Sequence, residues 1–257
     1  MLYSYGITLL ILCPLIFLSA FIDSIAGGGG LISLPAYIFA GLPIHTAYGT
    51  NKFTASTGTV MAVVNYLKGG CVDFQSAVFG GIFALVGSVL GTRLALSLSP
   101  RALQICLMVI LPIVGIFILT RRSNKYENQK NPPGPGLKIV LCSCTGLIFG
   151  CYDGFFGPGT GMFITLVLSG LIKLDLIKSV GTAKVINFSS NITSMVTWLL
   201  NGKILFPVAI PCMICSAAGG FLGSRIAMKT GIKFIRLILV LVTVLLFAKI
   251  LSDLIKI

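Results

Sequence analysis

Apolar runs long enough to cross a membrane occupy most of the 257-residue sequence. They cover residues 6–26, 47–67, 72–98 and 100–119 in the first half and 138–156, 176–200, 204–228 and 231–251 in the second. A shorter run, at 31–41 and again at 160–172, follows the first run of each half. A bilayer-spanning helix needs roughly 20 mainly apolar residues. The pattern therefore predicts an all-α fold, a polytopic membrane helix bundle.

The two halves resemble each other in sequence as well as in the order of their runs. Residues 49–95 align without a gap with residues 181–227, and 14 of 47 positions are identical. The matched pairs include Lys52 with Lys184 and Arg93 with Arg225. Chance similarity among apolar residues would not place charged residues in register, so the chain contains two copies of one unit.

The charged residues also predict how the two copies lie in the membrane. We predict a first transmembrane repeat at 1–120, a polar cytoplasmic linker at 121–137 and a second repeat at 138–257. Each half crosses five times if its short run spans the bilayer, which inverts the second half, and four times if that run is re-entrant. Inversion places twelve Lys and Arg residues in the cytoplasm and five outside, as the positive-inside rule favours. We therefore predict inverted repeats.

A glycine-rich break with an aspartate at its start precedes each short run. "DSIAGGGG" at 23–30 matches "DGFFGPGT" at 153–160. Irregular backbone at membrane depth is tolerated only where protein buries it or where it lines a watery cavity, and paired discontinuous helices mark the substrate site in many transporters. We therefore predict one broken helix in each half, with the two breaks at a substrate site.

The breaks suit an anionic substrate. Helices that begin near Leu31 and Gly161 would direct free N–H groups and positive dipole ends at a ligand. Lys52 and Lys184 could neutralise the anion, or could instead snorkel to the interface. Hydroxyls within spans can likewise bond their own helix. The predicted substrate-binding residues are Gly27, Gly28, Gly29, Gly30, Thr50, Asn51, Lys52, Gly157, Gly159, Thr160, Gly161, Lys184 and Asn187, with Thr182 as a weaker candidate.

The remaining charged residues allow structural and functional interpretations. Asp23 and Asp153 could couple transport to protons or pair with Lys52 or Lys184, and could equally bond local backbone amides at a helix end. Arg93 and Arg225 are expected to anchor helix ends at the interface, and His45 to lie at the surface or at a helix cap.

Composition narrows the functional class. With 56% hydrophobic and 10% charged residues, a soluble protein is excluded, so the net charge of +13 reports topology and not nucleic-acid binding. The eight cysteines lie mostly in apolar segments, where cysteine acts as a packing residue, and the Cys212–Cys215 spacing has no histidine beside it. With one histidine in the chain and no nucleotide-binding motif, we expect no metal and no cofactor.

Four segments carry a resemblance to a known family. "DSIAGGGGLISLPAYIFAGLP", "GTNKFTASTGT", "GCYDGFFGPGTGMF" and "TAKVINFSSNITS", in this order, resemble the sulfite exporter TauE/SafE family over essentially the whole chain. The resemblance implies a multi-pass inner-membrane protein of two homologous halves that moves sulfur-containing anions such as sulfite or organosulfonates. The motif residues at the breaks are Asp23, Gly27, Gly28, Gly29, Gly30, Pro35, Asp153, Gly157, Pro158, Gly159 and Gly161.

The leading hypothesis is a secondary transporter that exports a small anion by alternating access around the two breaks. Its partners would be the anion and the lipid bilayer, with a homo-oligomer left open. The alternatives are an anion channel or a membrane partner protein without transport of its own. A membrane enzyme is disfavoured because the sequence offers no constellation of nucleophile, histidine and acid.

Overall fold

A computed structural model describes residues 4–120 and 132–230. The helices in these ranges are α1 (Tyr5–Ala26), α2 (Gly30–Phe39), α3 (Ile44–Lys68), α4 (Phe74–Ser97), α5 (Pro100–Thr120), α6 (Pro135–Phe155), α7 (Thr160–Gly170), α8 (Leu176–Leu200) and α9 (Phe206–Thr230). Within the described ranges no strand occurs, which confirms the predicted all-α class. The expected run at 231–251 and most of the linker at 121–137 lie outside the described residues.

Four of these helices are long and apolar enough to cross a membrane, namely α1, α4, α6 and α9. Helices α3 and α8 have 25 residues each but are more polar, because they carry the lysines and asparagines of the predicted site. Large apolar side chains are exposed on the outer helices, among them Ile82, Leu90 and Leu94 of α4. In a membrane protein such a surface faces lipid.

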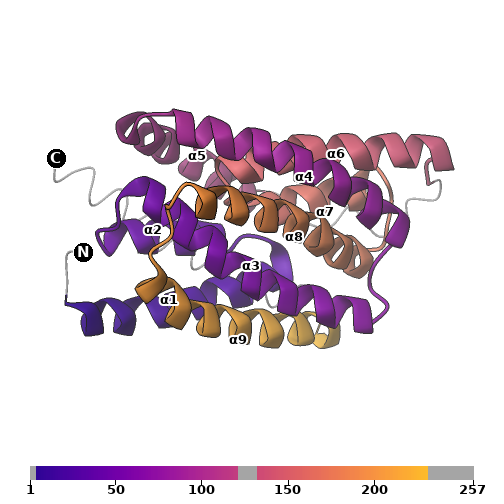
Figure 1. The fold of residues 1–257 in the computed structure, drawn as a ribbon. Coiled ribbons are helices and arrows are strands. Elements are labelled where there is room, and N and C mark those ends of the chain that lie inside the picture. Colours follow the sequence, from indigo (N-terminus) through magenta and orange to yellow (C-terminus); the bar gives the residue numbers. More distant parts are fainter. Residues whose placement is uncertain (1–3, 121–131, 231–257) are drawn as a thin grey trace.

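The long helices form three layers, each with one helix from each half of the chain. Figure 1 shows α1 beside α9 along one side of the molecule, α4 beside α6 along the other, and α3 with α8 between them. The outer layers therefore pair the first helix of one half with the fourth helix of the other half. The middle layer holds half of the buried polar residues in the described ranges, more than either outer layer.

Glycines bring the outer helices close together in the same way on both sides. A Cβ atom at Gly87 or Gly91 of α4 would collide with backbone of α6, and a Cβ atom at Gly219 or Gly223 of α9 would collide with α1. These glycines are equivalent between the halves, so the repeated positions that identify the duplication also serve the contact between the halves.

Candidate functional site

The two glycine-rich segments lie against each other at the centre of the bundle. Helix α1 ends at Ala26 and α2 begins at Gly30, while α6 ends at Phe155 and α7 begins at Thr160. Gly27 has a φ of 79° and Gly157 a φ of 93°, a left-handed conformation that glycine adopts without strain. A Cβ atom at Gly27 would collide with the backbone of Gly161 and Met162. The close approach of the two segments therefore requires glycine.

The N-terminal amides of the short helices are partly occupied by protein. Met162 donates its N–H to the carbonyl oxygen of Gly27 in the other half, at 3.2 Å. Gly29 donates to Oδ1 of Asp23 at 3.2 Å. The sequence predicted free N–H groups facing a ligand, and this is wrong for these two amides. The N–H of Met162 is bonded to the other half, and the N–H of Gly29 is bonded to Asp23.

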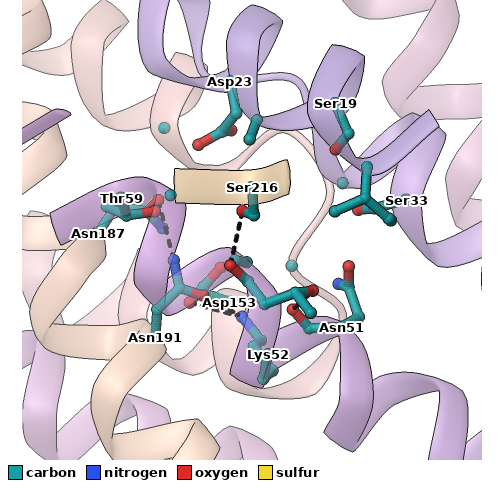
Figure 2. A pocket seen from close by; sticks show the side chains of 18 residues that line it. Ser19, Asp23, Ser33, Asn51, Lys52, Thr59, Asp153, Asn187, Asn191 and Ser216 are labelled. Atoms are coloured by element: carbon teal, nitrogen blue, oxygen red, sulfur yellow. Dashed lines mark hydrogen bonds and ion pairs between the residues drawn. The ribbon is translucent and has the colours of Figure 1, made fainter. Parts of the chain in front are cut away.

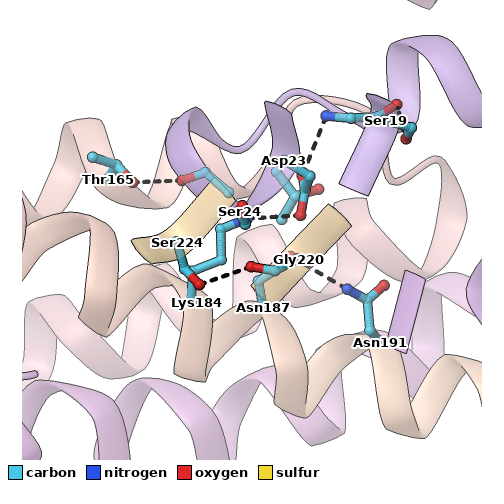
Figure 3. Close-up of polar contacts among 12 residues, drawn as sticks. Ser19, Asp23, Ser24, Thr165, Lys184, Asn187, Asn191, Gly220 and Ser224 are labelled. Carbon is cyan, nitrogen blue, oxygen red and sulfur yellow. Dashed lines mark hydrogen bonds and ion pairs between the residues drawn. The ribbon is translucent and has the colours of Figure 1, made fainter. Parts of the chain in front are cut away.

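Lys184 of α8 forms an ion pair with Asp23 of α1. Its Nζ lies 2.7 Å from Oδ2 of Asp23, with 1% of the lysine side chain and 24% of the aspartate side chain exposed. Figure 3 shows Lys184 beside Asp23, and the same carboxylate also accepts the N–H of Gly29. Asp23 therefore serves both roles that the sequence suggested, as a partner of lysine and as an acceptor for local backbone.

Lys52 of α3 forms the matching pair with Asp153 of α6. Its Nζ lies 2.8 Å from Oδ2 of Asp153, and each side chain is 3% exposed. The hydroxyl of Ser190 donates to the same carboxylate oxygen at 2.7 Å, and Lys52 also donates to Oδ1 of Asn191 at 2.9 Å (Figure 2). Every charge in this pair is therefore hydrogen-bonded, as a buried ion pair requires.

These two ion pairs are equivalent under the sequence duplication, and each joins one half of the chain to the other. Both lysine side chains are buried, so neither reaches the membrane interface. The snorkelling alternative is therefore wrong for both lysines. What distinguishes the pairs is access, because Asp23 is partly exposed and Asp153 is sealed.

A polar cavity of ≈ 40 Å³ lies between the breaks and the middle layer. Of the predicted residues it is lined by Asp23, Gly30, Asn51, Lys52, Asp153, Gly157, Gly161 and Asn187. Gly27, Gly28, Gly29, Thr50, Gly159, Thr160 and Lys184 are not among its lining residues. Lys52 therefore borders the cavity directly, whereas Lys184 stands behind Asp23.

Asn51 has no hydrogen-bond partner for its Oδ1 atom, although the residue is only 6% exposed. Buried polar atoms are nearly always paired. Because Asn51 also lines the cavity (Figure 2), its amide is available to whatever occupies that space.

Several lining residues escaped the sequence analysis. They are Ser19, Ser33, Thr54, Thr59, Asn191 and Ser216. Asn191 was detectable, since it follows Asn187 by four residues and so shares its helix face; its Nδ2 donates to Oδ1 of Asn187 at 3.2 Å. The serines gave no signal, because small hydroxyl residues are common in membrane helices.

Thr50 and Thr182 have a structural role in this conformation. The hydroxyl of Thr50 accepts the backbone N–H of Leu205 at 3.1 Å, and that of Thr182 accepts the N–H of Asp73 at 2.9 Å. The two acceptors, Thr50 and Thr182, are 132 residues apart in the sequence, and so are the two donors, Asp73 and Leu205. This is the shift that aligns residues 49–95 with 181–227. The two threonines thus hold the connections that enter α9 and α4.

His45 and the two arginines lie away from the cavity. The ring of His45 is 6.0 Å from that of Trp198, and its Nε2 lies 3.3 Å from the carbonyl oxygen of Ala95. Arg225 stacks over the ring of Phe221, at 4.1 Å from the ring centroid, whereas Arg93 is exposed. None of the three is positioned to contact a ligand in the cavity.

No disulfide forms among the eight cysteines, so the Cys212–Cys215 motif is reduced. Among the described residues no group of three or more His, Cys, Asp or Glu side chains could hold a metal ion. The chemistry of the cavity is therefore that of its ammonium, carboxylate, amide and hydroxyl groups.

Comparison with known proteins fits this arrangement. The sulfite exporter TauE/SafE family model matches residues 12–250. The chain belongs to this family. It is 36% identical to a "Probable membrane transporter protein" of Haemophilus influenzae, covering 92% of each chain. It is 31% identical to the "Probable membrane transporter protein YfcA" of Escherichia coli, covering 92% of this chain and 87% of that protein. No solved structure matches the chain. With its apolar helices, this TauE/SafE member is a multi-pass membrane protein.

Proposed function

We propose that the protein is a secondary transporter that exports a small anion, sulfite or an organosulfonate, by alternating access around the two glycine-rich breaks. The observation that carries the proposal is the duplicated ion pair, Lys52–Asp153 and Lys184–Asp23, placed where the two breaks meet. Charged groups inside a membrane protein are costly and mark substrate or ion pathways. The family and the names of its relatives, which describe transporters and not enzymes, support the same class.

Recognition of the anion would begin at Lys52. Its ammonium group borders the cavity and is held by Asp153 and Asn191. An incoming oxyanion offers Lys52 the same kind of acceptor as the carboxylate, and the amides of Asn51 and Asn187 line the same space. The anion would therefore either replace the carboxylate of Asp153 as the partner of Lys52 or share Lys52 with it.

The small size of the cavity supports the proposal that the described conformation lies between loading and release. A volume of ≈ 40 Å³ holds a few water molecules, each needing about 10–15 Å³ by this measure, but not a sulfonate. An anion can enter only when the halves move apart on one side. The glycine contact between Gly27 and Gly161 and the two ion pairs are the contacts that would open and close.

Asp23 and Asp153 are the proposed coupling groups. When an anion takes the lysine, the displaced carboxylate loses its counter-ion, and a proton carried with the anion would restore the charge balance of the site. The anion would thus move together with a proton. Asp23 faces Lys184, and Asp153 faces Lys52; these four side chains are the charged groups of the site.

The proposal includes two inverted repeats, with one broken helix in each half. The exchange of partners, α1 with α9 and α6 with α4, supports a twofold relation between the halves. A reporter fused to the C-terminus tests the orientation. An external location is expected, and a cytoplasmic signal would contradict inversion.

Flux measurements test the function itself. Purified protein in proteoliposomes should show saturable, gradient-dependent flux of sulfite or a small organosulfonate. Lys52→Gln should reduce this flux strongly, and Lys68→Gln, on the exposed end of the same helix, serves as the control. Flux that does not saturate would indicate a channel instead. Normal flux in both Lys52→Gln and Lys184→Gln would overturn the proposed site.

A further inference from the structure

Arg93 and Arg225 are equivalent in sequence but differ in their surroundings. The guanidinium group of Arg225 lies over the ring of Phe221. The residue that corresponds to Phe221 in the first half is Val89, which offers no ring. Arg93 is exposed, and in the part of the chain that the structure describes it has no ion pair with a carboxylate. The duplicated arginine thus has a local partner in one half only.

A groove of ≈ 460 Å³ adjoins Arg93 between α4 and α8. It is lined by Val89, Arg93, Leu96, Thr193, Val196, Thr197, Leu200 and Asn201. One wall is aliphatic, and the cationic and amide groups lie toward the ends of the two helices, at Ser97 and Leu200. The groove therefore combines aliphatic side chains with one cationic side chain, Arg93, which lies between Val89 and Leu96 along α4.

The corresponding surface of the other half is filled. There Phe221 takes the place of Val89, and Met228 the place of Leu96. A Cβ atom on Gly69, the counterpart of Asn201, would lie 2.7 Å from the sulfur of Met228. Asn65, the counterpart of Thr197, bonds the carbonyl oxygen of Phe221 and the hydroxyl of Ser224. Among the described residues, the side chains of Phe221, Met228 and Asn65 thus make contacts here that Val89, Leu96 and Thr197 do not make in the groove.

The surroundings of the groove determine what can occupy it. Leu90, Leu94 and Leu200 are more than half exposed, and in a multi-pass membrane protein such a surface contacts lipid. Arg93 lies four residues before the end of α4, or roughly 6 Å at 1.5 Å per residue, close to the depth at which arginine meets lipid headgroups. The occupant must therefore be apolar along most of its length and anionic at one end.

We propose that this groove is a binding site for one anionic phospholipid. Its phosphate accepts hydrogen bonds from the Arg93 guanidinium, whose planar donors match phosphate geometry. One acyl chain runs from Arg93 past Val89, away from the C-terminal ends of α4 and α8. The site is independent of the anion cavity and lies on the outer surface of the α4–α8 contact.

Native mass spectrometry of the detergent-purified protein tests the site with phosphatidylglycerol, and with zwitterionic phosphatidylethanolamine as the comparison lipid. Arg93→Gln should lower the affinity for the first bound phosphatidylglycerol by about fivefold, the effect of one basic residue near an anionic lipid. The affinity for phosphatidylethanolamine should change less. The control is Arg225→Gln, which removes an equal charge where the guanidinium group lies over the ring of Phe221 and should leave the first phosphatidylglycerol bound.

Val89→Phe separates the groove from the charge. It gives the first half the side chain found in the second, places a ring beneath Arg93 and fills the groove while the net charge stays the same. It should weaken phosphatidylglycerol binding as much as Arg93→Gln does. Full binding in Val89→Phe, or an equal loss in Arg225→Gln, would overturn the proposal, because the lipid would then be responding to surface charge alone. The proposal would also be overturned if the native protein is a dimer and Val89→Phe dissociates it, since the occupant of the groove would then be a second copy of the chain.

Discussion

Lys52 and Asp153 lie in different halves of the chain, yet their Nζ and Oδ2 atoms are 2.8 Å apart and each side chain is 3% exposed. Lys184 and Asp23 repeat the arrangement at 2.7 Å, with the aspartate 24% exposed. The same duplicated contact therefore exists in a sealed form and in an accessible form. This difference makes the two pairs separable by mutation.

Asp153→Asn should destabilise the protein more than Asp23→Asn. Removing one partner of a buried ion pair leaves the other charge uncompensated, which costs about 3–5 kcal/mol, whereas solvent near Asp23 reduces the cost in the accessible pair. Thermal unfolding in detergent measures the difference. The exchange Lys52→Asp with Asp153→Lys should recover part of the lost stability, and an equal loss in both single variants would show that access does not matter.

Asn51→Ala should weaken anion binding with little loss of stability. Its Nδ2 group can donate to an anion and its Oδ1 atom has no hydrogen-bond partner, so removing the amide breaks no hydrogen bond that this conformation makes. Asn65→Ala is the matched control on the same helix, because Asn65 bonds Phe221 and Ser224, and it should lose stability while retaining anion affinity. The affinity for sulfite and the unfolding temperature are measured on both variants. A loss of stability alone in Asn51→Ala, together with a loss of affinity alone in Asn65→Ala, would refute this assignment.

Gly27→Ala should be far more damaging than Gly70→Ala. Both glycines have positive φ angles, 79° and 65°, so alanine pays a similar backbone cost of about 1–2 kcal/mol at either site. Only at Gly27 does the added Cβ also collide with backbone of the other half, since nothing lies within 4 Å of a Cβ at Gly70. Comparable unfolding temperatures for the two variants would mean that the breaks do not need this close contact.

Thr182→Val should reduce stability and leave anion affinity unchanged. The variant keeps the shape of the side chain but removes the acceptor of the Asp73 N–H, and a buried backbone donor without a partner costs about 1–3 kcal/mol. Thr50→Val should have the same effect, because it removes the acceptor of the Leu205 N–H. A loss of sulfite affinity at unchanged stability would instead indicate that these threonines contact the anion.

Asp73 should make stability depend on acidity below about pH 4. Burial opposes its ionisation, but hydrogen bonds from Lys138 and Ser76 outweigh burial and hold the pKa of Asp73 below its usual value. Since the folded-state pKa is depressed, its contribution is complete above the unfolded value of about 3.9 and is lost as the pH falls through the folded value. The difference in unfolding temperature between the native chain and Asp73→Asn should therefore shrink between pH 5 and pH 3. A constant difference would contradict the ion pair with Lys138.

The apolar runs predicted the spans well because length and hydropathy are local properties. Helices α1, α4, α6 and α9 begin within a few residues of the runs at 6–26, 72–98, 138–156 and 204–228. The duplication also identified Asp23, Lys52, Asp153 and Lys184 as important before any contact was known. It could not decide which lysine meets which aspartate, because that pairing follows from the packing of α1 on α9 and of α6 on α4.

The direction of individual side chains was not predictable in the same way. Thr50 and Asn51 are neighbours in sequence, but Asn51 lines the cavity while the Thr50 hydroxyl accepts a backbone N–H from the other half. Adjacent helical residues point about 100° apart, so a motif on α3 necessarily contains residues of both kinds. Which residues of α3 line the cavity and which contact the other half depends on how the helix is rotated within the bundle.

Because Lys52–Asp153 and Lys184–Asp23 each join the two halves, neither pair can form before the second half of the chain exists. Ribosomes deliver the N-terminal part first, so Asp23 and Lys52 are synthesised before Asp153 and Lys184. The charges of the first half therefore gain their partners only when the second half has been made, which ties the electrostatic completion of the site to the later part of translation.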